Sequence, residues 1–577
     1  MTSAWLVAAA LTHWAVDPMS ETQYLPNTVP DDGVRGGVVQ IIAAKGEYEP
    51  GAFVLRSEAD LGRVKLVVGD LRTADGRIFP KEKLDLKTVK VWYQNGNAWF
   101  SYFADKGRKL CPELLLNDED LIRVDEERQS NYARLTEKDG RVHWFWLNNP
   151  AAFQNRAEDV KGFYFRLGDV FICMRENFMD AKVHCGARLE KGRSKQFLLT
   201  ANVTEDTAAG LYRGEIKVKS KSEKEKGAEF SIPIALRVLD FALPEPMCWA
   251  DVNKPFVTYF RDYTSLNMIR DQNGDDPELA RRQLVAICRD FAAHGQVLPS
   301  FADAIDNPDI VREGGQCYCD CLSNGKMELS DICVSRAAAR QARRLADRRF
   351  GRGSRPYMTW GDEYGIFALR GIRPMVKTYQ DFGFRFPINS PFAYAAGITL
   401  ADLFWPPCTP DHESAEVANK YAAATGGKGC FGWYSSQHVG VENPAFTRRQ
   451  YGFGPYRAGF TCNFNYAHHL DAWNDSVDDL YRPMALVYGT GGGCIDTLAW
   501  EGFREGLDDI RYATLLKRLA EPLLDSLDTN VRYEARLAVQ LLVDADKDNM
   551  DLTTLRLEMI RHILRLAKVK GRGNERS

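Results

Sequence analysis

Two adjacent carboxylates, Asp362 and Glu363, are the residues of this chain whose types and spacing best suit chemistry. They lie near the end of the stretch Tyr357–Tyr364, whose apolar start is typical of a short strand. The C-terminal ends of strands are where α/β barrels hold their reactive groups. Neighbouring strand residues point to opposite faces, so both carboxylates serve one pocket only where the strand is ending. Gly361 and Gly365 give the backbone that freedom, and the alternative is an exposed acidic turn.

The segments around the acidic pair alternate between strand-like and helix-like patterns, as βα units do. Helices are predicted over Asp276–Ala293 and Ser335–Phe350. Apolar segments typical of strands are residues 256–260, 296–298, 357–363, 385–389, 403–405, 430–435 and 459–466. Seven or eight strands over about 250 residues fit the size of a (β/α)8 barrel, which we predict for residues 246–500.

Polar and aromatic residues follow many of these strands. Since the C-terminal ends of barrel strands converge on one mouth, a barrel gathers such residues into one pocket. The predicted binding residues are Trp360, Tyr364, Asn389, Tyr394, Trp405, Trp433, Tyr434, Asn465, Tyr466, His468, Asp471 and Trp473. Amides and carboxylates beside indole and phenol rings are typical of a carbohydrate pocket. The alternative is that the rings only plug the barrel rim.

Residues 1–245 have the alternating pattern of a β-sandwich, with an irregular insertion over about residues 100–170. The predicted strands are residues 38–42, 51–55, 64–68, 88–93, 195–203, 211–219 and 230–239. A proline-rich linker, Phe241–Pro246, separates this domain from the barrel. Residues 501–577 have the pattern of amphipathic helices packed on the barrel. The sequence therefore predicts a multidomain chain: a β-sandwich, an α/β barrel and a C-terminal helical extension.

The composition excludes several classes of partner. The chain has 577 residues, 45% hydrophobic and 27% charged, with a net charge of −3. Neither a nucleic-acid partner nor membrane insertion is expected from such balanced charge and from apolar runs shorter than 18 residues. The stretch Ala4–Leu11 lacks the flanking basic residue and cleavage site of a signal peptide, so we interpret it as a first strand and leave a cytoplasmic or a periplasmic location open.

The cysteines raise a second chemical possibility. Thirteen scattered cysteines favour reduced thiols over a disulfide framework. Cys317, Cys319 and Cys321, with Cys333 beyond them, offer four thiols, but structural zinc sites usually leave two residues between paired cysteines. Free thiols or one local disulfide are the simpler interpretation. We therefore predict no metal and no cofactor, and the sequence leaves the oligomeric state open.

Three motifs resemble a known family. The stretch Leu498–Tyr512 contains Trp-Glu, then Arg-Glu-Gly, then paired acids, and it follows the Gly-rich loop Tyr488–Gly493. The stretch Lys45–Glu49 and the pair Asp362-Glu363 precede it along the chain. Together, and in this chain order, the three motifs resemble those of glycoside hydrolase family 123. The resemblance spans nearly the whole chain and implies a sandwich followed by a barrel.

The resemblance also implies an activity, retaining hydrolysis of β-linked N-acetylhexosaminides, N-acetylgalactosamine foremost, in which the acetamido group of the substrate is the nucleophile. By position, Glu363 is then the general acid/base and Asp362 the partner of the acetamido nitrogen. Proximity of like charges and partial burial are expected to raise the pKa of one of them. Two alternatives stay open: hydrolysis of a non-acetamido glycan through another carboxylate such as Asp402, Glu442 or Asp471, and an inactive carbohydrate-binding protein.

Overall fold

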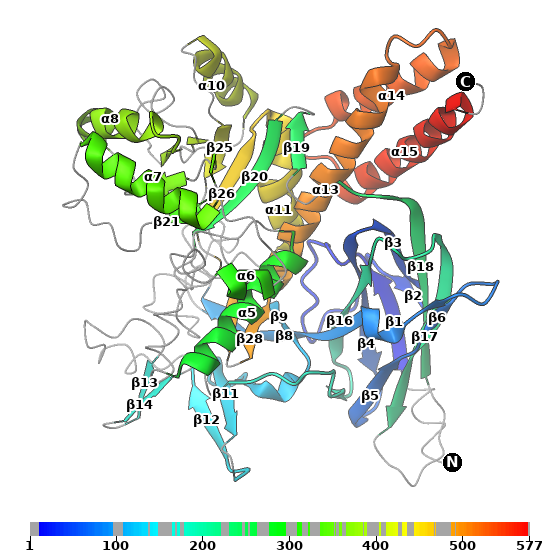
Figure 1. Cartoon of the computed structure of the whole chain (residues 1–577). Coiled ribbons are helices and arrows are strands. Elements are labelled where there is room, and N and C mark those ends of the chain that lie inside the picture. Colours follow the sequence, from blue (N-terminus) through cyan, green and yellow to red (C-terminus); the bar gives the residue numbers. More distant parts are fainter. Residues whose placement is uncertain are drawn as a thin grey trace. The chain divides into compact units, whose positions relative to one another are not determined.

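The chain divides into two compact units in the computed structural model (Figure 1). The N-terminal unit comprises residues 1–243, 440–447 and 469–502, and the C-terminal unit comprises residues 244–439, 448–468 and 503–577. The structure describes residues 11–95, 108–136, 139–147, 164–167, 170–173, 178–220, 230–244, 248–251, 254–261, 276–295, 308–313, 321–323, 335–350, 352–353, 357–359, 365–384, 386–388, 403–404, 411–424, 430–434, 443–466, 468, 486–490 and 492–574.

Two large sheets form most of the N-terminal unit. The first is antiparallel throughout, and its order is β2 (Val34–Arg35), β1 (Leu11–Val16), β4 (Glu47–Ser57), β16 (Ser194–Val203), β8 (Leu84–Asn95) and β9 (Arg108–Leu116). The main path of the second is β15 (Ala187–Leu189), β5 (Gly62–Val68), β17 (Gly210–Ser220), β18 (Phe230–Ala242) and β3 (Val39–Lys45), with β6 (Leu71–Arg72) and β7 (Ile78–Phe79) beside it. All seven strands predicted for this region are present.

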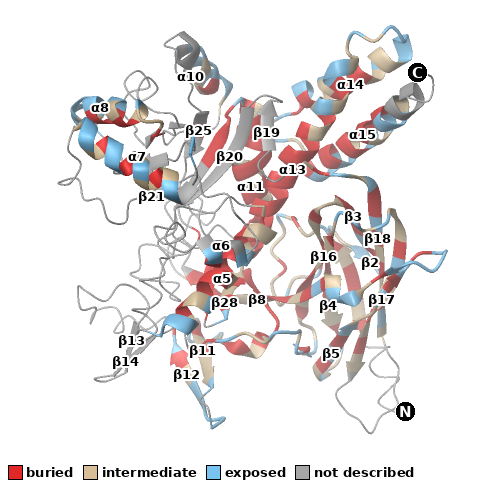
Figure 2. Ribbon diagram, viewed as in Figure 1, coloured by how far each residue is buried: buried red, intermediate tan, exposed pale blue. Residues whose placement is uncertain are grey.

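The two sheets share one hydrophobic core, drawn red in Figure 2. Phe53 of β4 stacks on Phe197 of β16, with ring centroids 5.0 Å apart, and both belong to the same buried cluster as Ile216 of β17 and Ile234 of β18. Alternate residues of β4, such as Phe53 and Leu55, face this core, while Ala52 and Val54 between them belong to a second buried cluster on the other face of the sheet.

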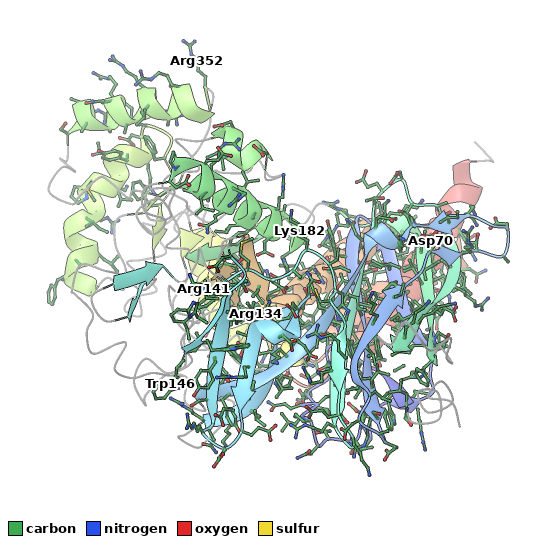
Figure 3. The ribbon with its side chains drawn as sticks, turned by 90° about the horizontal axis from the view of Figure 1, so that it is seen from below. Asp70, Arg134, Arg141, Trp146, Lys182 and Arg352 are labelled. Carbon is green, nitrogen blue, oxygen red and sulfur yellow. The ribbon has the colours of Figure 1, made fainter. Side chains whose placement is uncertain are left out.

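The predicted irregular insertion is wrong for the part of residues 100–170 that the structure describes. Residues 108–116 form β9 of the first sheet. A three-stranded antiparallel sheet follows, made of β10 (Ile122–Asp125), β11 (Ser130–Thr136) and β12 (Val142–Trp146). The physical reason is alternation: Phe145 is buried, whereas its neighbours Trp144 and Trp146 are more exposed. Trp146 is labelled in Figure 3. Short elements of the same unit are η1 (Lys81–Lys83), η2 (Glu119–Leu121), β13 (Tyr164–Leu167) and β14 (Val170–Cys173).

The Gly-rich loop forms a hairpin of β27 (Val487–Thr490) and β28 (Gly493–Asp496). Gly493 has a φ of 137°, a conformation that side chains rarely adopt. The Tyr488 hydroxyl donates to buried Glu113 at 3.1 Å, and the Trp92 indole and Gln94 amide each donate to the same carboxylate at 2.7 Å. This buried network explains why the hairpin, which lies within the range predicted for the barrel (residues 246–500), belongs to the N-terminal unit.

A curled half-barrel sheet organises the C-terminal unit. Its order is β19 (Cys248–Asp251), β20 (Lys254–Arg261), β26 (Cys462–Tyr466), β25 (Cys430–Tyr434), β24 (Leu403–Phe404) and β23 (Pro387–Ile388). All neighbours from β20 to β23 are parallel. β21 (Cys321–Ser323) and β22 (Tyr357–Thr359) form a second parallel pair. Among the described parallel strands of the C-terminal unit, the pairing of β20 with β26 joins the first to the last.

Helices alternate with these strands, as parallel pairing requires. They are α5 (Pro277–Ala293), α6 (Pro308–Glu313), α7 (Arg336–Phe350), α8 (Ile366–Gln380), α10 (His412–Ala424), the π-helix η5 (Arg449–Phe453) and α12 (Gly454–Ala458). η6 (Glu521–Leu523), α14 (Thr529–Asp544) and α15 (Leu552–Asn574) follow, while α11 (Pro444–Arg448) and α13 (Leu498–Ala520) have residues in both units. None of the helices in the described ranges combines the length and the apolar character that a membrane crossing needs.

Buried charges hold α13 to its neighbours in the C-terminal unit. Arg448 donates to both oxygens of Asp509, at 2.7 and 2.8 Å, and Arg556 of α15 donates to Asp509 at 2.7 Å and to Glu505 at 2.6 Å. All four side chains are at most 6% exposed. Burial raises the pKa of Glu505, whereas the two guanidiniums outweigh burial at Asp509 and lower its pKa. Two cations and two anions thus neutralise each other away from water.

Two glycines let α13 approach the π-helix closely. A Cβ on Gly506 would lie 2.4 Å from the carbonyl oxygen of Arg448, and one on Gly452 would lie 2.3 Å from the Cα of Gly506. Such distances are far inside van der Waals contact, so both positions exclude any larger residue unless the backbones separate.

Replacing Gly506 with Ala is therefore expected to lower the free energy of unfolding by about 1–3 kcal/mol. The matched control is Gly371→Ala in α8, where a Cβ would meet nothing within 4 Å. Since alanine favours helix over glycine, this control should gain up to about 1 kcal/mol. Urea denaturation of both variants measures the contrast, and equal shifts would contradict the close helix contact.

Candidate active site

The acidic pair lies in the connection between β22 and α8. β22 ends at Thr359, and α8 begins at Ile366 after its N-cap residue Gly365. Asp362 and Glu363 themselves lie outside the described residues, so their role as catalytic groups stays a prediction. The strand that was predicted to lead into the pair is present, and a helix follows it, as in a βα unit.

The parallel strands bring several other predicted positions to one edge of the sheet. Trp433 of β25 pairs with Asn463 of β26, Tyr434 pairs with Phe464, and Asn465 pairs with Phe260 of β20. Because parallel strands end at the same edge, the backbones of Trp433, Tyr434, Asn465 and Tyr466 lie together at the carboxyl ends of their strands.

Two further predicted positions follow short strands of this sheet directly: Asn389 comes after β23 and Trp405 after β24. Their own placement lies outside the described ranges. The same holds for Trp360, Tyr364, Tyr394, Asp471 and Trp473. A sugar-binding role for all of these residues therefore remains a prediction.

His468 is the predicted site residue whose side chain the structure describes. It follows β26 at the carboxyl edge and is fully buried. Its Nε2 lies 3.1 Å from Oδ2 of Asp290 on α5, and its ring contacts the ring of Phe291, with centroids 4.2 Å apart. His468 thus fixes the chain that leaves β26 to the helix that follows β20.

Asp290 serves two histidines at once. Its Oδ1 lies 3.0 Å from Nδ1 of His294, one helical turn further along α5, while its Oδ2 contacts His468. Burial by itself would raise the pKa of Asp290, but the charge and hydrogen bonds of His294 and His468 outweigh burial and hold the pKa well below its usual range. Asp290 is therefore a buried carboxylate that stays ionised.

A buried amide side chain, that of Asn463, fixes the start of β26. The side-chain nitrogen of Asn463 donates to the carbonyl oxygen of Tyr451 in the π-helix. Tyr451 in turn stacks on Phe503 of α13, with centroids 5.2 Å apart. A π-helix leaves one residue outside the regular α-helical hydrogen-bond pattern, and here Gly452 departs from helical geometry. β26 is thereby tied to the helix that carries the buried charges.

Sequence reasoning did not single out Asp290 or His294. Their spacing of four on a predicted amphipathic helix was the signal present, since residues four apart on a helix are neighbours. The pattern of α5 does predict its core correctly, because Leu284, Ile287 and Phe291 are buried. Asp276 caps the helix by accepting from two backbone amides, at 2.9 and 3.0 Å.

Five of the cysteines whose side chains the structure describes form no disulfide, namely Cys111, Cys185, Cys288, Cys462 and Cys494. Cys317, Cys319 and Cys333 of the cysteine motif lie outside the described residues, and Cys321 begins β21. The expectation of free thiols or one local disulfide at this motif, with a metal as the alternative, therefore stays a prediction.

The comparisons with known proteins bear on the fold. No protein-family model matches the chain, and no curated protein matches it. A solved structure does resemble it over its whole length: a family 123 glycoside hydrolase from Clostridium perfringens, studied for the hydrolysis of glycolipid glycans. The TM-score is 0.61, the sequence identity is 10%, and the alignment covers 98% of this chain and 99% of the hydrolase. The chain therefore has the multidomain fold of that structure.

The Asp290 cluster gives a testable pH dependence. The pKa of the Asp290 carboxyl is lower in the folded chain than the unfolded value of about 3.9. The ionised carboxylate therefore stabilises the fold fully above that pH, and this stabilisation is lost as the pH falls toward the folded pKa. Asp290→Asn should therefore destabilise the chain most near pH 7, and the difference from the wild type should shrink between about pH 4 and pH 3. Urea denaturation across this range measures it, and a difference independent of pH would contradict the assignment.

Proposed function

We propose that the chain is a glycoside hydrolase that cleaves terminal β-linked N-acetylhexosamine, with N-acetylgalactosamine preferred, through participation of the substrate's own acetamido group. The observation that carries the proposal is the position of Asp362-Glu363, in a connection from a strand to a helix, within a fold that resembles a family 123 hydrolase along its whole length. The resemblance of the Leu498–Tyr512 motif to that family supports the same class.

The proposed architecture is a β-sandwich followed by a (β/α)8 barrel. Two features support the barrel: the alternation of strands with helices, and the parallel pairing of β20 with β26. Pairing of the first strand with the last is what barrel closure requires. In this arrangement the connection after β22 opens onto the same mouth as the carboxyl ends of β23 to β26.

Adjacent carboxylates suit acetamido participation better than direct displacement. A retaining enzyme with its own nucleophile places two carboxyl groups about 5–5.5 Å apart across the scissile bond, and these usually come from different strands. When the acetamido oxygen attacks the anomeric carbon, the protein needs no nucleophile. Glu363 then protonates the departing glycosidic oxygen, and Asp362 orients the acetamido nitrogen and stabilises the positive charge that develops on it.

In the second half of the reaction, Glu363 acts as a base instead of an acid. The oxazolinium intermediate is opened by water at the anomeric carbon, and Glu363 removes the proton from that water. The aromatic positions at the strand ends, such as Trp433 and Tyr434, would stack on the apolar face of the sugar. Asn389 and Asn465 would hydrogen-bond its hydroxyls.

The test compares two variants on two kinds of leaving group. Glu363→Gln should reduce cleavage of substrates with poor leaving groups by about 10²- to 10⁴-fold, but spare nitrophenyl substrates, because an activated phenolate needs little protonation. Asp362→Asn should slow both kinds, since the developing charge forms with either leaving group. Initial rates on aryl and alkyl N-acetyl-β-galactosaminides give the comparison.

A thiazoline analogue of the intermediate should inhibit the wild type, and aryl galactosides and glucosides without the acetamido group should not be cleaved. Efficient cleavage of a plain galactoside, unaffected by the thiazoline, would exclude the acetamido mechanism. Absence of cleavage across the whole panel would leave a carbohydrate-binding protein.

A further inference from the structure

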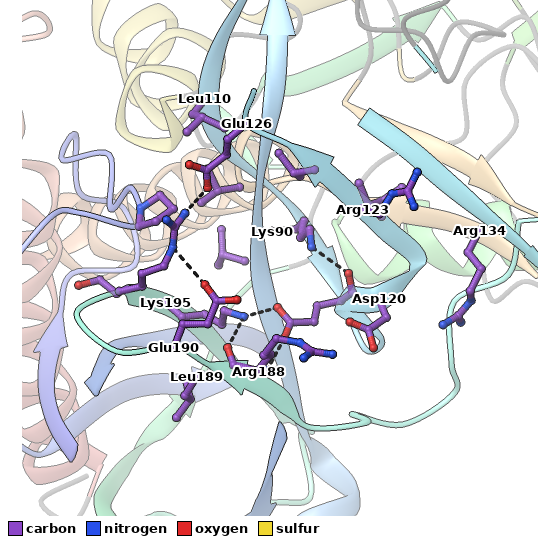
Figure 4. A pocket seen from close by; sticks show the side chains of 18 of the residues that line it. Lys90, Leu110, Asp120, Arg123, Glu126, Arg134, Arg188, Leu189, Glu190 and Lys195 are labelled. Atoms are coloured by element: carbon purple, nitrogen blue, oxygen red, sulfur yellow. Dashed lines mark hydrogen bonds and ion pairs between the residues drawn. The ribbon is translucent and has the colours of Figure 1, made fainter. Parts of the chain in front are cut away.

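The N-terminal unit contains a pocket of about 600 Å³, lined by residues of the three-stranded sheet and of β8, β15 and β16 (Figure 4). Its volume is within the range of small-molecule sites, roughly 300–1,000 Å³. Charged side chains dominate one part of its lining: Lys90, Arg123, Arg134, Arg188, Arg193 and Lys195 with Glu119, Asp120, Glu126 and Glu190. The lining residues all belong to the N-terminal unit, whereas Asp362 and Glu363 belong to the C-terminal unit.

The carboxylates of the pocket are already neutralised. Glu119 forms an ion pair with Lys195, and Asp120 forms one with Arg63. Arg193 serves the remaining two, contacting Glu126 and, at 3.5 Å, Glu190. At Glu119, burial would raise the pKa, but Lys195 and Lys90 outweigh it and lower the pKa. Each of these four carboxylates therefore has a cationic partner.

Three cations of the pocket are not compensated in the same way. Among the described residues, no carboxylate forms an ion pair with Lys90, Arg123 or Arg188. Lys90 donates to the backbone carbonyl of Glu119 at 3.0 Å. Arg123 lies over the rings of Tyr132 and Trp144, at 4.5 and 4.8 Å from their centroids, which holds its guanidinium in place without neutralising it.

Burial lowers the pKa of Lys90 to about 8, although the negative charge of Glu119 opposes this shift. A bound anion would further favour the charged form of Lys90.

Apolar residues also line the pocket, and Val91, Leu110 and Val124 are the partly exposed ones on β8, β9 and β10. Apolar walls beside cations suit an organic anion that has both a charged group and C–H faces, whereas inorganic phosphate would leave the walls unused. From this combination we infer that the pocket is a binding site for an acidic sugar, a pyranose that carries a carboxylate or a sulfate group. The choice of a sugar among organic anions rests on the proposed glycosidase function.

The ligand's anionic group would be held by Arg123, Arg188 and Lys90, and its ring would pack on the apolar walls. Arginine binds both carboxylates and sulfates through paired N–H groups. Such a site would hold an acidic residue of a glycan chain and restrict the enzyme to glycans that carry one.

The test is calorimetric binding to the full chain at 0.15 M salt, with three hexasaccharides as probes. Hyaluronan hexasaccharide carries carboxylates only, chondroitin sulfate hexasaccharide carries both anions, and maltohexaose carries neither. At least one acidic probe should bind with 1:1 stoichiometry, and the two acidic probes separate carboxylate from sulfate recognition. Arg123→Gln/Arg188→Gln should weaken that binding by about tenfold or more, since charge-assisted hydrogen bonds are lost.

The matched control removes the same charge elsewhere. Arg344→Gln/Arg348→Gln replaces two exposed arginines of α7 and should leave the affinity for the acidic probes unchanged. Equal weakening by both double variants, binding of maltohexaose as tight as that of the acidic probes, or absence of binding would overturn the inference. Because binding is measured without turnover, pocket-dependent binding by a chain that cleaves no aryl glycoside would reject the proposed hydrolase and keep the site.

Discussion

The buried pairing of Arg448 and Arg556 with Asp509 and Glu505 is the constraint on which the C-terminal unit depends. Ions are costly to remove from water, and loss of one member of such a pair typically costs about 3–5 kcal/mol, because its partner is left buried without compensation. The cluster therefore fixes the relative positions of α11, α13 and α15. Glycine contacts then bring α13 against the π-helix, and Asn463 connects that helix to β26.

This chain of contacts reaches the edge where chemistry is proposed. β26 is held at its start by Asn463 and just after its end by His468, whose partner Asp290 belongs to α5. The ends of β26 and of its neighbour β25 carry four of the predicted binding positions, namely Asn465, Tyr466, Trp433 and Tyr434. Reacting groups need a framework that holds them within fractions of an ångström, and buried ionic and amide contacts supply one.

Alternating apolar residues predicted the large sheets of the N-terminal unit and the amphipathic helix α5, because these patterns follow directly from strand and helix geometry. They did not predict that the motif Leu498–Tyr512 buries its charges. Acidic residues such as Glu505 and Asp509 are typical of the exposed first turns of a helix. Their burial in ion pairs depends on Arg448 and Arg556, which are distant in the sequence. The three-stranded sheet was not predicted, because charged turns between its short strands interrupt the alternation of apolar and polar residues. For the candidate site, the strands that lead to it were predicted, while its side-chain geometry depends on connections that local pattern does not determine.

The stereochemistry of the first product tests the central claim most directly. Proton NMR can follow the cleavage of an aryl N-acetyl-β-galactosaminide in real time, before the anomers of the released sugar equilibrate. Two successive displacements at the anomeric carbon, the first by the acetamido oxygen, should release the β-anomer first. Release of the α-anomer first would require direct attack by water and would contradict the proposed roles of Asp362 and Glu363.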